Sequence, residues 1–339
     1  MKKYNKYRFY IIGTGNDYIK YMWKDAVEKE NVIFLDTPIY EEFPLKKLYN
    51  AVEQKQYSFK LNLFWHIPGK KLWSKYYTIN DVEFDTDFNN IIVFSDVMRI
   101  QTDFIFWKRL KAKYNLTYCL ILLNSCEHDF NANSNTVKKI INSLNMDKIF
   151  TFDNHDASSY QLHYFPSLYS GLVPSKEKKE YDFYFVGKKK NRYDCIIDTY
   201  FALKKSGYKC LFRITDVEEN EMIKDDGIIY NNYIPYDKVV EELSKSYGIV
   251  DIRIPGQSGL SLRYFEALQY NKVLLTNNPS VKKTPYYNNN HMYFFENTEE
   301  IQTLLQGKID VVNYDYDGRY SPVRLLAMLQ SYIEGNKYE

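Results

Sequence analysis

Short apolar runs alternate with amphipathic stretches in the first part of the chain. The run at residues 8–13 leads into a glycine-containing turn, and a helical pattern over residues 17–29 and a second apolar run at residues 31–36 follow it. This order predicts a strand, a turn, a helix and a second strand. The chain therefore begins with the unit from which parallel sheets are built.

The same pattern continues further along the chain. Apolar runs at residues 90–96 and 117–124 predict two more strands, with a helix near residues 102–113 between them. Both runs are apolar at successive positions, which is typical of strands buried on both faces of a parallel sheet. A shorter run at residues 148–153 ends in Asp153, which we expect to cap a short helix.

The alternation stops at residues 167–180, where Gly, Pro and Ser occur together with a run of charges. This composition predicts a linker. Beyond it, strands are predicted at residues 181–187, 209–214, 226–230, 248–252 and 272–278, and helices near residues 191–205, 234–246 and 321–333. The pattern therefore predicts two α/β domains, a comfortable division for 339 residues.

Composition narrows the class of protein. Hydrophobic residues make up 45% and charged residues 26% of the chain, as in soluble globular proteins, and no apolar run reaches the roughly 20 residues that cross a bilayer. The basic and then apolar N-terminus reads as a first strand, not as a signal peptide. The 4 cysteines show no C-x-x-C spacing, so we expect a reduced cytoplasmic setting without a zinc site. A net charge of +2 argues against nucleic acid as a partner.

The region with the most specific chemistry lies between Asp251 and Asn278. A predicted strand leads into the loop PGQSG and then into a helix whose first turn contains residues 258–261. A helix start presents unpaired backbone N–H groups to an anion, and a carboxylate further along, Glu266, can accept hydrogen bonds from a ribose diol. This spacing fits a nucleoside diphosphate, and it also occurs in α/β proteins that bind nothing there.

Three stretches of the chain resemble one family. The stretch GQSGLSLRYFEALQYNKVLLTNN is similar to the donor-site signature of GT-B glycosyltransferases of bacterial capsule, O-antigen and lipopolysaccharide synthesis. FTFDNHDASSYQLHYFPSLY resembles their domain-joining segment, and YDFYFVGKKKNR resembles the first strand and loop of their donor domain. The resemblance covers residues 148–280 well and the N-terminal half loosely.

The resemblance implies an α/β protein of the GT-B fold, with two Rossmann-like domains facing a central cleft and a C-terminal helix that crosses back to the first domain. It implies an acceptor domain at residues 1–168, a donor domain at residues 175–318 and a returning helix at residues 319–339. The implied activity is hexosyl transfer from a nucleoside-diphosphate sugar to a saccharide or lipid-linked saccharide acceptor. We therefore expect a cytoplasmic enzyme with peripheral contact at the inner membrane face.

The resemblance also implies roles for individual residues. The turn at residues 258–261 binds diphosphate, Arg263 supports the phosphates or Glu266, and Glu266 holds the ribose. Gly187 permits close approach of the loop after its strand, and one of the four cations of the loop KKKNR neutralises the leaving group, with Arg192 slightly favoured among them. For any single one of these cations, a place on a solvated face is the more common role. The full set of expected donor-binding residues is Gly187, Lys188, Arg192, Gln257, Ser258, Gly259, Leu260, Ser261, Arg263 and Glu266.

The sequence predicts no metal site and no cofactor other than the donor substrate. A metal-dependent GT-A enzyme needs a D-x-D motif after a strand. The chain has DTD at residues 85–87 and DYD at residues 315–317, and we interpret both as loop carboxylates.

An inverting transferase needs a general base near the acceptor hydroxyl, whereas a retaining one does not. Asp17, at the helix start after the first strand, is the first candidate. Asp96 ends the strand predicted at residues 90–96, and Glu127 follows the strand predicted at residues 117–124. Both are weaker candidates, because carboxylates at these positions also serve as caps or lie in solvent. An aromatic stretch around Trp65 and His66 could stack on a sugar or simply pack in a core.

Two other functions compete with the transferase. GTGN after the first strand suggests a nicotinamide-dependent oxidoreductase, but Tyr18 stands where the third glycine of G-x-G-x-x-G should fall and Asp36 alone is weak support. A non-catalytic protein on the same fold would keep the nucleotide-sugar site and turn nothing over.

Overall fold

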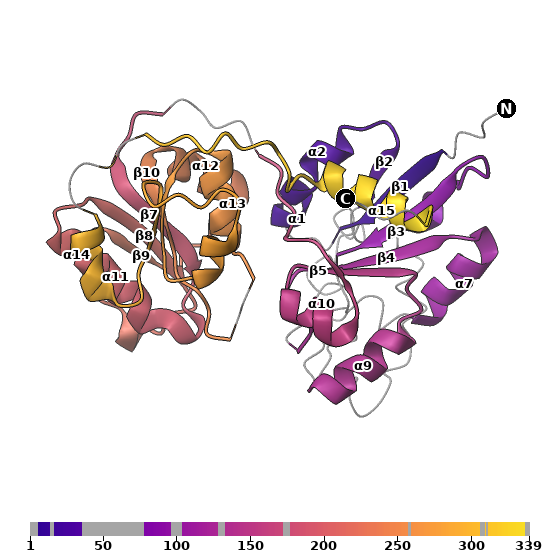
Figure 1. Cartoon of the computed structure of the whole chain (residues 1–339), viewed down its shortest axis with the longest axis horizontal. Helices are drawn as coiled ribbons and strands as arrows, with labels where there is room; N and C mark the ends of the chain where they lie inside the picture. The colour runs from indigo at the N-terminus through magenta and orange to yellow at the C-terminus, as the bar shows by residue number, and fades with distance from the viewer. Residues whose placement is uncertain are drawn as a thin grey trace, which may run out of the picture. The chain divides into compact units, whose positions relative to one another are not determined.

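The computed structural model describes residues 6–13, 17–35, 78–95, 104–127, 133–171, 177–256, 259–305, 309 and 311–335. The chain divides into two compact units (Figure 1). Unit 1 comprises Met1–Ser167 together with Pro322–Glu339, and unit 2 comprises Leu168–Ser321. The chain therefore leaves unit 1 once and returns to it for its last helix.

Unit 1 contains a parallel sheet with the strand order β2-β1-β3-β4-β5-β6. Its strands are β1 (Tyr7–Ile12), β2 (Val32–Leu35), β3 (Asn89–Phe94), β4 (Thr117–Leu122), β5 (Lys148–Thr151) and β6 (His163–Tyr164). The register places Tyr10 beside Ile33 on one side and beside Ile92 on the other. Nearly every residue of β1, β3 and β4 is buried, as their continuous apolar runs predict.

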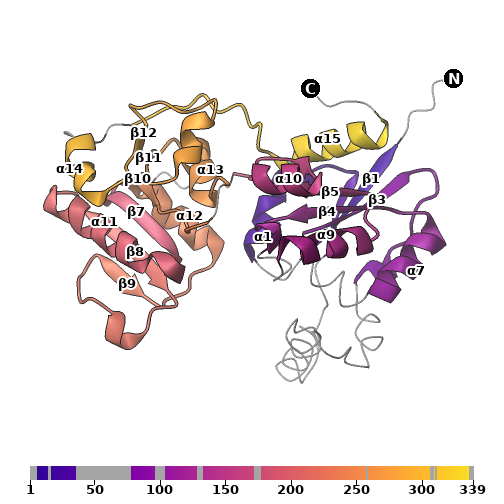
Figure 2. The same ribbon diagram turned by 60° about the horizontal axis from the view of Figure 1, so that its bottom comes forward.

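Helices cover both faces of this sheet. They are α1 (Asp17–Met22), α2 (Lys24–Val27), α7 (Phe104–Tyr114), α9 (Ser134–Ser143), α10 (Asn154–Tyr160) and α15 (Pro322–Ile333), with the 3-10 helix η1 (Thr78–Asp81). Figures 1 and 2 show α15 on one face and α7 and α9 on the other. Trp107 of α7 and Val137 of α9 pack on Phe94 and Leu120 in the core of that second face.

Unit 2 contains a second parallel sheet, with the order β12-β11-β10-β7-β8-β9. Its strands are β7 (Tyr181–Lys188), β8 (Cys210–Thr215), β9 (Ile228–Tyr230), β10 (Ser246–Asp251), β11 (Val273–Thr276) and β12 (Met292–Phe294). After β7 the chain adds β8 and β9 on one side, and it then returns to add β10 and β11 on the other. The order of strands thus reverses between β7 and β10, which is the topological switch point of the sheet.

Helices also cover both faces of the second sheet. They are α11 (Tyr193–Lys205), α12 (Tyr236–Ser244), α13 (Leu262–Gln269) and α14 (Ile301–Leu304), joined by the 3-10 helices η2 (Lys190–Arg192), η3 (Glu219–Glu221), η4 (Pro279–Lys283) and η5 (Thr298–Glu300). Helices α11 and α14 pack together on one face, while α12 and α13 contact β10 from the other (Figure 2). Both faces of β10 and β11 are therefore shielded from solvent.

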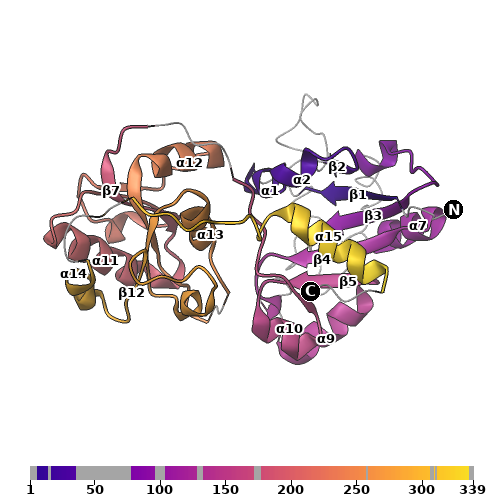
Figure 3. The same ribbon diagram turned by 45° about the horizontal axis from the view of Figure 1, so that its top comes forward.

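The predicted fold class is confirmed: two Rossmann-like units with parallel sheets, and a last helix that belongs to the first unit. Figure 3 shows α15 lying along the sheet of unit 1. The packing of Tyr332 on His163, with ring centroids 4.4 Å apart, and the contact of α15 with α2 hold it there. Its buried face consists of Leu325, Leu326, Met328 and Leu329.

One local prediction is wrong. The helix expected over residues 17–29 breaks at Trp23, whose buried indole donates a hydrogen bond to Ser95 Oγ at 3.3 Å, so that α1 and α2 are separate helices. The chain passes from unit 1 to unit 2 between Ser167 and Leu168, inside the segment expected as a linker, and the described residues after this crossing belong to unit 2. Leu168 and Tyr169 are buried, and Lys179 Nζ donates to the Ser244 carbonyl at 2.6 Å.

Candidate functional site

The loops that follow β7 and β10 meet at the switch point of unit 2. Arg192 Nη1 donates a hydrogen bond to the carbonyl of Ile252, the first residue after β10. Its Nη2 donates to the carbonyl of Lys188, the last residue of β7, at 3.3 Å. One guanidinium therefore spans the gap between the two strands at the carboxyl edge, where open α/β sheets bind ligands.

The charge of Arg192 is held at this edge without a dedicated counter-ion. Among the described residues no carboxylate forms an ion pair with Arg192, and its buried Nε has no hydrogen-bond partner there. Burial lowers the pKa of Arg192, while the nearby Asp251 carboxylate opposes this effect and Arg263 adds to it. A buried donor without an acceptor is costly, so the position favours an anionic ligand.

The absence of a side chain at Gly187 leaves room for the Arg192 guanidinium. A Cβ at Gly187 would lie 3.1 Å from Arg192 Nη2 and 3.4 Å from the Phe185 ring. The first distance is tighter than ordinary van der Waals contact, so any side chain there would press on the guanidinium. Glycine thus accommodates a neighbouring side chain, and the expected approach of the loop to a ligand remains a proposal.

The other cations of the basic loop differ from Arg192. Lys188 Nζ lies 3.0 Å from Asp216 Oδ2, and both side chains are exposed. Lys189 forms an ion pair with Glu221. Lys190 is exposed and has no ion-pair partner in the described parts of the chain. Two of the four charges are therefore compensated within the protein. Of the other two, Arg192 is the stronger candidate for binding an anion, because its guanidinium is held at the edge of the sheet.

Helix α13 follows β10 in the sequence, after the loop of residues 252–261. Ser261 is the N-cap: its hydroxyl accepts from the Arg263 amide at 3.1 Å, and its carbonyl accepts from the Tyr264 amide at 3.1 Å. The preceding loop is fixed by Asn278, whose Nδ2 donates to the Gly259 carbonyl at 3.0 Å. Leu260 lies between these two anchors and is partly buried.

Glu266 lies inside the unit and has no exposed surface (0%). Its Oε1 accepts a hydrogen bond from the Tyr236 hydroxyl at 2.9 Å, and its Oε2 accepts one from Arg263 Nη1 at 2.8 Å. Arg263 Nη2 in turn donates to the carbonyl of Val186 in β7 at 2.5 Å. Burial raises the pKa of Glu266, and Arg263 and Tyr236 oppose that rise. Arg263 thus pairs with the carboxylate, the second of its two expected roles.

The same network reaches the segments that enter and leave unit 2. The Tyr236 hydroxyl lies 2.9 Å from that of Tyr169, which also donates to the Tyr270 hydroxyl at 3.0 Å. The Tyr169 amide donates to the carbonyl of Tyr320 at 2.9 Å. A continuous set of hydrogen bonds therefore joins Glu266 to both crossing segments.

The structure adds residues that sequence reasoning missed. Asp251 at the end of β10 is buried, and its Oδ2 accepts from Thr276 Oγ1 at 3.0 Å. Tyr233, in the loop from β9 to α12 at the same edge, has 78% of its surface exposed. The available signal was the position of both residues near the carboxyl ends of predicted strands, Asp251 within the last two residues of one and Tyr233 three residues beyond another.

The candidate bases of unit 1 come from strands around its own switch point, between β1 and β3. Asp17 is the first residue of α1, which follows β1, while Asp96 lies outside the described residues. Glu127 is described and exposed. The adjacent amide of Cys126 donates to the buried Asp156 at 2.7 Å, which fixes the chain beside Glu127.

Several expected residues cannot be placed. Gln257 and Ser258 of the phosphate turn lie outside the described residues, as do Trp65, His66 and Asp36. Within the described ranges no group of three or more His, Cys, Asp or Glu residues is arranged to hold a metal ion. None of the helices described here is long and apolar enough to cross a membrane.

No protein-family model matches the chain, and no curated protein matches its sequence. Among solved structures, UDP-N-acetylglucosamine 2-epimerase from Rickettsia bellii aligns with a TM-score of 0.48 over 98% of this chain and 98% of its own, at 13% identity. The DNA-modifying enzyme β-glucosyltransferase aligns with a TM-score of 0.45 over 95% and 92%, at 13% identity. The glycosyltransferase SnogD from Streptomyces nogalater aligns with a TM-score of 0.37 over 80% and 82%, at 9% identity. These likenesses concern the backbone and assign no substrate to this chain.

Proposed function

We propose that the protein is a glycosyltransferase that moves a sugar from a nucleoside-diphosphate sugar to a saccharide acceptor. The observation that carries the proposal is the Arg192 guanidinium, held across the switch point of unit 2 with a buried Nε that lacks an acceptor among the described residues. This is a place for a fixed anion, and a diphosphate is the anion that the adjoining helix start also accommodates.

Each part of the donor has a proposed partner. Arg192 and the turn before α13 bind the diphosphate, and the exposed ring of Tyr233 stacks on the base. The ribose hydroxyls donate hydrogen bonds to Glu266, whose two oxygens offer about four lone-pair positions. Because Glu266 is buried, the ribose must first displace the Tyr236 hydroxyl from it.

The chemical step breaks the bond between the anomeric carbon and the diphosphate and forms a bond from that carbon to an acceptor oxygen. Negative charge develops on the departing diphosphate, and Arg192 stabilises it without a metal ion. On the acceptor side, Asp17 takes the proton of the acceptor hydroxyl if the configuration inverts. Asp96 and Glu127 are the alternatives.

The acceptor is proposed to be a saccharide or lipid-linked saccharide of a bacterial capsule, O-antigen or lipopolysaccharide. Support comes from the resemblance of residues 256–278 to the donor signature of that group of enzymes. Unit 1 would bind the acceptor and unit 2 the donor. The enzyme would then work in the cytoplasm, with peripheral contact at the inner membrane face.

The test is a thermal-shift screen of nucleoside diphosphates and their sugars, each with EDTA and with added Mg²⁺. A ligand at about 100 times its dissociation constant stabilises by roughly 2.7 kcal/mol, so binding is readily detected. We expect one nucleotide class to bind equally with and without EDTA, and its sugar to be consumed with acceptor. Binding without turnover on any saccharide acceptor would favour the non-catalytic alternative, and no binding at all would overturn the proposal.

A further inference from the structure

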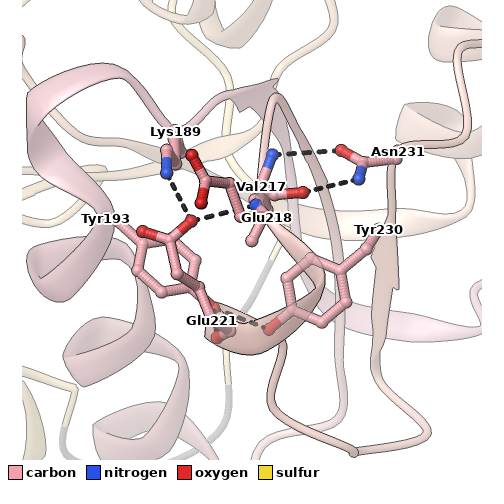
Figure 4. A network of polar contacts seen from close by, with 7 residues as sticks. All are labelled: Lys189, Tyr193, Val217, Glu218, Glu221, Tyr230 and Asn231. Atoms are coloured by element: carbon pink, nitrogen blue, oxygen red, sulfur yellow. Dashed lines mark hydrogen bonds and ion pairs between the residues drawn. The ribbon is translucent and has the colours of Figure 1, made fainter.

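The loops at the carboxyl ends of β7, β8 and β9 are tied into one surface (Figure 4). Asn231, directly after β9, makes two hydrogen bonds with the backbone of Val217, after β8: its Oδ1 accepts from the amide at 3.1 Å and its Nδ2 donates to the carbonyl at 2.7 Å. The hydroxyls of Tyr193 and Tyr230 lie 3.1 Å apart. The loop that carries Arg192 is part of this surface.

Glu221, the last residue of η3, holds the Arg192 loop from two sides. Its Oε2 accepts from Lys189 Nζ and from the Glu218 amide, the latter at 2.9 Å. Its backbone carbonyl accepts from the Tyr193 hydroxyl at 2.7 Å. Lys189 and Tyr193 stand on either side of residues 190–192, so a single residue anchors both ends of that short segment, as Figure 4 shows.

The anchored segment contains a backbone conformation that its side chain does not favour. Lys190 has a φ of +42°, in the left-handed region that L residues other than Gly, Asn and Asp rarely occupy. Within the same turn, the Arg192 amide donates to the Lys189 carbonyl at 3.2 Å. The surroundings must supply the energy that keeps Lys190 in this conformation.

We propose that Glu221 is a positioning residue for the donor site: by holding Lys189 and Tyr193 it keeps Lys190 left-handed and so presents the Arg192 guanidinium to the donor diphosphate. This inference rests on the proposed function for the identity of the ligand. Glu221 itself contacts no part of the donor. Its effect passes entirely through the backbone of residues 189–193.

The mechanism predicts a specific rescue. Glu221→Ala removes the carboxylate anchor and lets the segment relax, and the cost of a left-handed residue corresponds to a loss of about tenfold in affinity for inorganic pyrophosphate or a nucleoside diphosphate. Glycine adopts the left-handed conformation freely. In a Lys190→Gly background, Glu221→Ala should therefore cost no more than about twofold.

Lys190→Ala is the matched control, because it removes the same charge but keeps the conformational preference of an L residue. In this background Glu221→Ala should again cost about tenfold. The measurement is calorimetric titration of the Lys190→Gly and Lys190→Ala proteins, each with and without Glu221→Ala, and near-ultraviolet circular dichroism checks that all are folded. An equal penalty in the glycine and alanine backgrounds would overturn the proposal.

A second measurement separates this inference from the proposed function. Amide hydrogen exchange of the peptide spanning residues 188–193 is followed in the ligand-free protein, with and without Glu221→Ala. Faster exchange in the variant supports the positioning role even if no phosphate compound binds the wild-type protein, an outcome that would overturn only the donor site. Unchanged exchange together with unchanged pyrophosphate affinity would overturn the positioning role itself.

Discussion

The Tyr236 hydroxyl lies 2.9 Å from Glu266 Oε1 and 2.9 Å from the Tyr169 hydroxyl. A single phenol thus connects a fully buried carboxylate to the segment by which the chain enters unit 2. The same hydroxyl covers the oxygen that the proposed ribose would need. Stability and donor binding therefore compete for one hydrogen-bonding position.

Replacing Tyr236 with Phe should have opposite effects on these two properties. Loss of a donor to a buried charged acceptor should lower the free energy of unfolding by about 1–3 kcal/mol. Nucleotide affinity should rise, because the ribose no longer displaces a hydroxyl from Glu266. Chemical denaturation and calorimetric titration measure the two effects. Weaker nucleotide binding in the folded variant would contradict the proposed place of the ribose.

Replacing Arg192 with Lys should weaken nucleoside-diphosphate binding while keeping the charge. The shorter ammonium cannot hold the carbonyls of Ile252 and Lys188 and face the diphosphate at once, and hydrogen bonds to charged groups contribute about 1.5–3 kcal/mol. We therefore expect the dissociation constant to rise by roughly tenfold or more.

Lys188→Gln is the control for this experiment. Lys188 belongs to the same loop, but its charge is compensated by Asp216 and both side chains are exposed. Exposed ion pairs contribute little, so nucleotide affinity should change by about 1 kcal/mol or less. Equal losses in the two variants would show a diffuse electrostatic effect and no specific role for Arg192.

Asp17→Asn tests the acceptor side. Asp17 begins α1 directly beyond β1, one of the two strands at the switch point of unit 1. If it is the base, turnover should fall by at least about a hundredfold with donor affinity nearly unchanged. Steady-state kinetics with a donor identified by the screen measure this, and Glu28→Gln, at an exposed position, serves as the control. Near-normal turnover would redirect the search to Asp96 or Glu127, or to a retaining mechanism.

Lys272→Met should stabilise the protein near neutral pH. Burial, followed by the nearby Lys179, lowers the pKa of Lys272 to about 6. An unfolded lysine has a pKa of about 10.4, so between these values the unfolded chain binds one more proton and stability rises with pH. Methionine removes this dependence. Lys272 Nζ donates to the carbonyls of Ser244 and Ser246. Both carbonyls keep a donor in the variant, because Lys179 Nζ donates to them as well.

The measurement is the midpoint of thermal unfolding between pH 6 and pH 9 for wild type and variant. The wild-type midpoint should rise more steeply with pH than that of Lys272→Met. Lys205→Met makes the same chemical change at an exposed position of α11 and should leave the wild-type slope intact. Parallel slopes in all three proteins would mean that Lys272 carries its charge in the folded state.

Hydrophobic periodicity predicts most of this fold, because parallel strands are buried on both faces and therefore appear in the sequence as continuous apolar runs. The strand expected at residues 8–13 is β1, and the cap expected at Asp153 accepts from the amides of His155 and Asp156. Periodicity did not reveal α9, although its Val137 is buried, or the three-residue β12. The break between α1 and α2 at Trp23 depends on a contact with Ser95, which is distant in the sequence. The local sequence pattern therefore does not predict it.

The candidate site was predictable only in part, for a related reason. The spacing of strand, loop and helix suggested Glu266, and the resemblance to GT-B enzymes added Arg192 and Arg263 to the same expected donor site. It could not show that Glu266 is buried and already bonded, or that Lys188 and Lys189 are paired with Asp216 and Glu221. Such pairings join loops that are distant in the sequence, and three-dimensional packing decides them.

The hydrogen bond between the Tyr169 amide and the Tyr320 carbonyl has a consequence for the architecture as a whole. These residues lie close to the two ends of unit 2, so that unit is an insertion within the sequence of unit 1, and its own ends are neighbours. An excised fragment of residues 168–321 would have adjacent termini, the arrangement that tolerates circular permutation and domain transfer. Unit 2 is thus continuous in the sequence and separable, whereas unit 1 also needs residues 322–339, which are made only after unit 2.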